Sequence, residues 1–208
     1  MTLRAVTIDA YGTLVMLRDP VPALQAALAD RGIVRDAVEV RRAFELEAAF
    51  YTARSHEGRD DATLALLRKK CARVFLDAAR AKLDPDAFAP AFVSSLTFEE
   101  LPGARAACQT LGDAGLRLAV VSNWDIGLRE HLDRLGIGAL ADVIVTSAEA
   151  GAPKPAPAVF ELALDRLGVD AAQAVHVGDG ASDEEGAHAA GMQFEQAPLA
   201  DAAQRILA

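Results

Sequence analysis

Short apolar runs of this sequence lead into polar residues whose types could support a reaction. In chain order these residues are Asp9, Ser122 with Asn123, Lys154, and Asp179 with Asp183. Singly, residues of these types are also common in turns and helix caps. Together they supply carboxylates, a hydroxyl and an ammonium group. Carboxylates that lie close together repel one another, and a divalent cation or a lysine offsets that repulsion. The set is compatible with a small anionic substrate, provided that cations are placed locally.

The elements that must position these residues form an alternating pattern. The apolar, β-branched runs predict strands at 3–8, 116–121, 143–145 and 174–177, with helical patterns at 104–112, 126–135 and 157–167 between the later ones. Such alternation is typical of right-handed βαβ units, and it predicts a Rossmann-like α/β fold with a parallel sheet and helices on both faces. Ligands of such sheets bind at the carboxyl ends of the strands. The candidate residues are therefore expected to meet at one edge.

A long helical segment separates the first strand from the others. Residues 20–97 show helical spacing of apolar residues, which predicts four helices and no strand. We therefore expect an α/β core domain made of residues 1–14 plus 98–208, with residues 15–97 as an all-helical insertion. Near the end of the chain, residues 193–196 are polar where one more apolar strand is expected, so the last strand is predicted to be short or missing.

The composition is that of a globular protein with a sizeable core. The 208 residues are 52% hydrophobic and 25% charged. With 21 basic and 30 acidic residues the net charge is −9, which argues against nucleic acid or an anionic membrane as a partner. Since no apolar run could span a bilayer and the first residues predict a strand rather than a signal peptide, a cytoplasmic protein is expected. Cys71 and Cys108 are predicted to be buried free thiols.

Four segments of the sequence together carry a family resemblance. In order they are Asp9-Ala-Tyr-Gly-Thr-Leu14, Val121-Ser-Asn-Trp-Asp125, Gly151-Ala-Pro-Lys-Pro155 and Gly178-Asp-Gly-Ala-Ser-Asp183. They resemble the four motifs of the haloacid dehalogenase-like (HAD) hydrolases. The stretch from His176 to Met192 is similar to the subfamily that carries a helical cap after the first motif. Residues 15–97 match that cap in position and in helical character.

The resemblance implies a hydrolase that uses an aspartate nucleophile on a small anionic metabolite. Asp9 would be the nucleophile, because a carboxylate can form an aspartyl-phosphate or an aspartyl ester and so divide one difficult displacement into two easier ones. Ser122 would hold the substrate anion through its hydroxyl. Lys154 would supply a positive charge to the nucleophile and the transferring group.

The same resemblance implies a Mg²⁺ site and a set of substrate contacts. The ion would be held by Asp9, the backbone carbonyl of Tyr11, Asp179 and Asp183, which are the oxygen ligands that this hard cation prefers. Asp183 would also take part in catalysis. The residues expected to contact substrate are Tyr11, Ser122, Asn123, Trp124 and Lys154. The protein would be a monomer or a homodimer.

One motif residue departs from the pattern of the phosphatases in this family. Those enzymes carry a second aspartate two positions after the nucleophile, which protonates the leaving alcohol, and this chain has Tyr11 there. A phenol is a far weaker acid than a carboxylic acid. General acid catalysis contributes roughly a factor of 10² to 10⁴. Turnover of phosphate esters should therefore be slow, biased toward good leaving groups, or dependent on an acid from the cap.

Tyr11 is compatible with more than one function. The Asp-x-Tyr-Gly-Thr-Leu variant is similar to that of 2-haloacid dehalogenases, in which the halide leaves without a proton and no metal is needed. Asp179 and Asp183 favour Mg²⁺-dependent phosphatase-like chemistry instead, since dehalogenases usually carry a Ser-Ser-Asn-type fourth motif. The third hypothesis is a catalytically weak binding protein.

Overall fold

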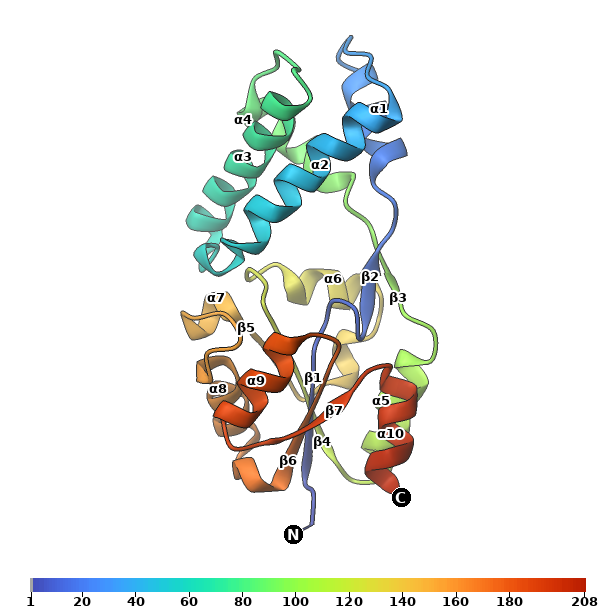
Figure 1. Cartoon of the computed structure of the whole chain (residues 1–208), viewed down its shortest axis with the longest axis vertical. Coiled ribbons are helices and arrows are strands. Elements are labelled where there is room, and N and C mark those ends of the chain that lie inside the picture. Colours follow the sequence, from blue (N-terminus) through green and yellow to red (C-terminus); the bar gives the residue numbers. More distant parts are fainter. Residues whose placement is uncertain (1) are drawn as a thin grey trace. The chain divides into compact units, whose positions relative to one another are not determined.

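The chain folds into two compact units that are described separately. The computed structural model describes residues 2–208. One unit, called the core unit below, holds residues 2–16 and 99–208, and the helical unit holds residues 17–98 (Figure 1). Two short strands, β2 (Val15–Leu17) and β3 (Phe98–Glu100), pair with each other where the chain passes between the units.

The core unit is built on a parallel sheet. Its strands are β1 (Ala5–Ile8), β4 (Arg117–Ser122), β5 (Val143–Thr146), β6 (Ala174–Gly178) and β7 (Gln193–Gln196). They form a 5-stranded sheet in the order β5-β4-β1-β6-β7, and each neighbouring pair is parallel. With β1 at the centre, both neighbouring strands, β4 and β6, contribute residues to the edge at which β1 ends.

Helices cover both faces of this sheet. They are α5 (Ala104–Asp113), α6 (Leu128–Arg134), α7 (Ser147–Ala150), α8 (Ala158–Leu167), α9 (Ala181–Ala189) and α10 (Leu199–Leu207). Short 3₁₀ turns, η2 (Gly138–Leu140) and η3 (Ala171–Gln173), precede β5 and β6. Figure 1 shows α8 and α9 on one face, with α5 and α10 on the other. The arrangement confirms the Rossmann-like α/β fold expected from the alternating pattern.

Burial explains why the strands read as nearly continuous apolar runs. All residues of β1 and β6, and five of the six residues of β4, are buried, because helices pack on both sides of them. The last strand, β7, lies at the sheet edge, where only one side needs a partner strand. Its polar sequence is tolerated there. The strand spans only Gln193–Gln196, so the prediction of a short strand is confirmed and the alternative of a missing strand is wrong.

The helical unit contains four helices, as expected, and one short turn. These are α1 (Val21–Ala29), α2 (Ala37–Thr52), η1 (Ser55–Glu57), α3 (Asp61–Ala78) and α4 (Pro85–Ser94). Asp36 and Asp60 cap the N-termini of α2 and α3. Phe75, Phe88 and Phe92 pack together in the core of this unit.

Two further expectations concern the chain as a whole. Cys71 and Cys108 are buried and, within residues 2–208, neither forms a disulfide, as predicted. Among the described residues, no helix is both long enough and apolar enough to cross a membrane.

Candidate active site

The candidate residues meet at the carboxyl ends of β1, β4 and β6. Asp9 directly follows β1, Ser122 ends β4, and Asp179 directly follows β6. Asp183 lies in the first turn of α9, and Lys154 lies in the loop between α7 and α8. The parallel sheet thus brings together residues from four separate motifs, which is where ligands bind in folds of this type.

Lys154 is the centre of the site. Its ammonium donates hydrogen bonds to Asp9 Oδ1 at 2.6 Å, to Asp183 Oδ1 at 2.5 Å and to the carbonyl oxygen of Val121 at 3.2 Å. The Lys154 side chain is only 3% exposed, and those of Asp9 and Asp183 are 8% and 4% exposed. A buried cation is therefore shared between two buried carboxylates, an arrangement that compensates part of the cost of burying each charge.

The pKa values of Lys154 and Asp183 reflect this sharing. Burial by itself would lower the pKa of Lys154, but the negative charges of Asp9 and Asp183 outweigh it and raise that pKa above its ordinary value. Burial by itself would raise the pKa of Asp183, but hydrogen bonds from His176 and Lys154 and the charge of Lys154 lower it to about 2. Both groups are therefore charged at neutral pH.

Ser122 adds a second hydrogen bond to Asp9. The Ser122 hydroxyl donates to Asp9 Oδ1 at 3.0 Å, so that this oxygen receives both the hydroxyl and the Lys154 ammonium. Within the described part of the chain, the hydrogen bonds to the Asp9 carboxylate all end on Oδ1. The other oxygen, Oδ2, receives none of these hydrogen bonds.

Asp179 completes a cluster of three carboxylates. One oxygen from each of Asp9, Asp179 and Asp183 lies within 4.8 Å of the others, close enough for all three to hold one metal ion. Partial desolvation of its carboxyl group, together with the charges of Asp9 and Asp183, raises the pKa of Asp179. Asp179 is exposed while the other two are buried, so the cluster is open to ligands on the Asp179 side.

Two glycines make room for this cluster. Gly12 has a φ of +84°, and a Cβ at that position would lie 2.3 Å from Asp179 Oδ2. At Gly178 a Cβ would lie 2.4 Å from Asp183 Cγ. Because carbon atoms cannot approach so closely, the carboxylates can occupy these positions only against glycine.

Asn123 supports Lys154 through its amide. Asn123 Oδ1 accepts a hydrogen bond from the Lys154 backbone N–H at 2.7 Å, and Asn123 Nδ2 donates to the Lys154 carbonyl oxygen at 3.1 Å. In the structure the Asn123 amide therefore holds the backbone of Lys154, and a contact between Asn123 and substrate stays a prediction.

The other two predicted substrate contacts differ in exposure. Tyr11 is 45% exposed and lies in the loop after β1. Trp124 is buried, and its ring lies 5.8 Å from that of His131 on α6. Trp124 therefore packs against α6.

The sequence analysis missed two residues that support the site. His176 contacts Asp183, and Thr7 contacts His176. His176 Nε2 lies 3.0 Å from Asp183 Oδ1, and His176 Nδ1 lies 2.8 Å from Thr7 Oγ1. The sequence did contain a sign of this contact, because Thr7 and His176 are polar residues in buried strands. Thr7 lies two positions before Asp9, and His176 lies two positions before Gly178.

Comparison with known proteins places the chain in a family. The family model of haloacid dehalogenase-like hydrolases matches residues 3–191. Over 208 aligned residues the chain is 35% identical to haloacid dehalogenase-like hydrolase domain-containing protein 3 of Mus musculus, covering 92% of this chain and 80% of that protein. It is 33% identical to a phosphoglycolate phosphatase of Rhodospirillum rubrum, covering 91% and 77% of the two chains. The crystal structure of a 2-haloacid dehalogenase from Pseudomonas syringae pv. Tomato shares the fold, with a TM-score of 0.68 at 23% identity over 99% of this chain and 98% of that one.

Proposed function

The chain belongs to the haloacid dehalogenase-like hydrolases, and from that premise we propose that it is a Mg²⁺-dependent phosphatase of a small phosphorylated metabolite. Asp9 acts as the nucleophile in this proposal. The observation that carries it is the cluster of Asp9, Asp179 and Asp183, whose ligand oxygens lie within 4.8 Å of one another. A dehalogenase that needs no metal has no use for a third carboxylate at this distance from its nucleophile.

The donor set fits Mg²⁺. Carboxylate oxygens are the ligands this ion prefers, and it usually takes few of them from the protein and the rest from water and substrate phosphate. Three carboxylates beside the single Lys154 ammonium give the cluster an excess of negative charge, which a divalent cation would offset. Asp9, Asp179 and Asp183, with the Tyr11 carbonyl, would hold the ion. When bound, it would supply positive charge to the phosphoryl oxygens.

The residues of the site have separate roles in the proposed reaction. Asp9 Oδ2 attacks phosphorus and the bond to the ester oxygen breaks, which leaves an aspartyl-phosphate and an alkoxide that takes up a proton to become the alcohol. Lys154 and Ser122 hold Asp9 Oδ1, so the carboxylate presents its free oxygen in a fixed orientation. Water then attacks the phosphorus of the aspartyl-phosphate, the bond between phosphorus and Asp9 Oδ2 breaks, and inorganic phosphate leaves with the Asp9 carboxylate regenerated. The departing oxygen needs a proton, and Tyr11 stands where the phosphatases of this family carry an acid.

A second candidate function, 2-haloacid dehalogenation, is favoured by Tyr11 itself. In that reaction Asp9 displaces a halide from carbon and forms an ester, which water hydrolyses. Because a halide leaves without a proton, no acid is needed at the position of Tyr11. The phosphatase proposal ranks first because the carboxylate cluster has a role in it, and because one relative that aligns over nine-tenths of the chain is a phosphoglycolate phosphatase.

Two parallel assays separate the candidates. The purified protein is incubated with an activated aryl phosphate and with 2-chloropropionate, each with Mg²⁺ and with excess chelator. The phosphatase proposal expects phosphate release that disappears with chelator and in Asp179→Asn. Chloride release that is indifferent to chelator would overturn it in favour of dehalogenation. Asp9→Asn should abolish either activity and serves as the control for contaminating enzymes.

A further inference from the structure

A buried hydrogen-bonded chain runs from the middle of the sheet to the active site. It begins at the Thr7 hydroxyl, passes through both nitrogens of the His176 ring and ends on Asp183 Oδ1. The distances are 2.8 Å between Thr7 Oγ1 and His176 Nδ1 and 3.0 Å between His176 Nε2 and Asp183 Oδ1. Asp183 Oδ1 is the same oxygen that accepts the hydrogen bond from Lys154.

The sheet register explains why these groups meet. Thr7 on β1 and His176 on β6 are paired across the two parallel strands, so their side chains lie next to each other. Two residues further along β6, the side chain would point to the same face, but that position is Gly178. The missing Cβ leaves the space that Asp183 fills, which brings its carboxylate within reach of the imidazole.

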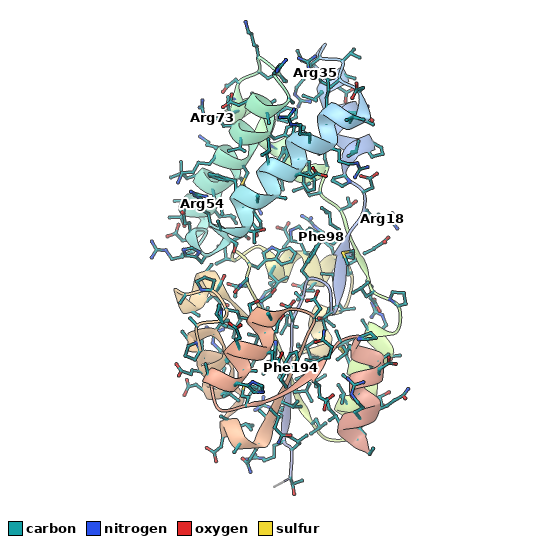
Figure 2. All side chains as sticks on the ribbon, in the orientation of Figure 1. Arg18, Arg35, Arg54, Arg73, Phe98 and Phe194 are labelled. Carbon is teal, nitrogen blue, oxygen red and sulfur yellow. The ribbon has the colours of Figure 1, made fainter. Side chains whose placement is uncertain are left out.

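Aromatic rings hold the imidazole in place. His176 is fully buried. The ring of Phe160 meets it edge-on, with centroids 4.9 Å apart and planes at 85°. The ring of Phe194 on β7, labelled in Figure 2, lies 6.4 Å from it on a tilted plane. With both nitrogens bonded and its faces packed, the ring has little freedom to rotate.

The partners also determine which nitrogen carries the proton. An ionised Asp183 can only accept, so His176 Nε2 must donate to it. With the proton on Nε2, a ring that carries a single proton presents Nδ1 as an acceptor, 2.8 Å from Thr7 Oγ1. Nδ1 then accepts from the Thr7 hydroxyl. Thr7 therefore selects the tautomer that can serve Asp183.

We propose that His176, backed by Thr7, is a positioning residue that fixes the Asp183 carboxylate for the metal and for Lys154. This inference rests on the proposed function for its link to Mg²⁺. Asp183 Oδ1 is held by His176 and Lys154, and Asp183 Oδ2 accepts from the Gly180 N–H at 3.1 Å, so both ends of the carboxylate are restrained. Without His176, the Lys154 ammonium alone would orient Oδ1, and that ammonium is shared with Asp9.

The test compares two substitutions of similar size. His176→Gln keeps an N–H donor near the place of Nε2, whereas His176→Met has a similar shape and no donor. Mg²⁺ binding to the metal-free protein is measured by calorimetry, which does not depend on turnover. Partners that orient metal ligands typically contribute 10- to 100-fold in metal affinity. His176→Met should therefore bind Mg²⁺ at least about tenfold more weakly than the wild type, and His176→Gln should recover most of the loss.

Two calorimetric results would overturn the proposal. The first is a folded His176→Met protein that binds Mg²⁺ as tightly as the wild type. The second is an equal loss in His176→Met and His176→Gln, because the effect would then come from packing and not from the hydrogen bond. If His176→Met does not fold, Thr7→Val and Thr7→Ser form the second pair. The valine variant should bind Mg²⁺ more weakly, and the serine variant, which keeps the hydroxyl, should not.

Crystal structures of the variants separate this inference from the proposed function. A wild-type protein that binds no Mg²⁺ would overturn the proposed function. The positioning role would still be tested by the position of the Asp183 carboxylate. In His176→Met the carboxylate should move away from Lys154 Nζ, and in His176→Gln it should stay beside it. An unmoved Asp183 in His176→Met would overturn the inference whatever the metal does.

Discussion

The Lys154 ammonium lies 2.6 Å from Asp9 Oδ1, although the two residues are 145 positions apart in the chain. Both side chains are almost fully buried, and the same ammonium also contacts Asp183. The Lys154 ammonium therefore balances charge on both Asp9 and Asp183. Removal of that cation leaves two buried carboxylates facing each other.

Lys154→Met should disable the protein in two ways. Removing one partner of a buried ion pair typically costs about 3–5 kcal/mol of folding free energy. Activity on the aryl phosphate should fall at least about 100-fold, because the charge that stabilises the transferring group is lost. Denaturant unfolding and steady-state kinetics measure the two effects. Lys82→Met, at an exposed lysine, is the matched control and should change stability by less than about 0.5 kcal/mol.

Asn123→Ala should lower kcat more than it raises KM. The Asn123 amide bonds to the backbone N–H and carbonyl of Lys154, so its removal displaces the ammonium, and small displacements at a reacting centre can cost up to about 10²-fold in rate. Asn123→Asp keeps the acceptor for the Lys154 N–H and should lose less. A rise in KM with kcat unchanged would show instead that Asn123 binds substrate directly.

Gly178→Ala should weaken Mg²⁺ binding by displacing Asp183. The new Cβ would lie 2.4 Å from Asp183 Cγ, so the carboxylate or the strand must move, and such overpacking costs about 1–3 kcal/mol. Gly112→Ala on α5 meets no atom within 4 Å and is the control. It should leave Mg²⁺ binding unchanged and stabilise the helix by up to about 1 kcal/mol. Calorimetric Mg²⁺ titration of both variants decides the point, and equal affinities would contradict it.

The sequence predicted the positions of the core strands well, because burial on both faces demands apolar residues. The runs ending before Asp9, Ser122 and Asp179 have this character, and a parallel sheet necessarily gathers their carboxyl ends. The fold and the common edge of the site could therefore be predicted without coordinates. The polar edge strand β7 was harder to predict because its lone neighbour, β6, supplies the hydrogen bonds that define it.

The supporting contacts of the site could not be predicted in the same way. No local pattern signals that the Asn123 amide holds the Lys154 backbone, since the two lie 31 residues apart and meet only through the fold. The sequence around His176 is that of a buried strand, and His176 is indeed buried, yet its Nε2 contacts Asp183. Such contacts depend on register and on the space left by Gly178, which only the three-dimensional arrangement reveals.

The stability of the helical unit should fall as pH rises from about 4.5 to about 7. Glu47 on α2 is only 3% exposed, and burial raises its pKa from 4.5 to about 7 against a weaker opposing hydrogen bond with Cys71. The folded chain thus keeps a proton that the unfolded chain releases, so unfolding becomes easier as pH rises through this window. The full effect is on the order of 3 kcal/mol.

Glu47→Gln tests this dependence. The amide stays neutral at every pH, so the unfolding free energy of the variant should lose this decline and exceed that of the wild type at pH 8. Urea unfolding at pH 5 and pH 8 gives both values. Glu45→Gln, at an exposed position of the same helix, should keep the wild-type slope. An unchanged slope in Glu47→Gln would show that another group is responsible.

Tyr11→Asp should restore the missing acid if the protein is a phosphatase. The proton for the leaving oxygen matters most when that oxygen belongs to an alkyl alcohol, and general acid catalysis is then worth roughly 10² to 10⁴. We therefore expect a large gain in kcat on an alkyl phosphate and little change on the activated aryl phosphate. Tyr11 is 45% exposed, so the substitution should cost little stability. Tyr11→Asn has a similar shape and no proton to give. An equal gain in both variants would attribute the effect to removal of the ring, and no gain in either would favour a reaction in which the leaving group departs without a proton.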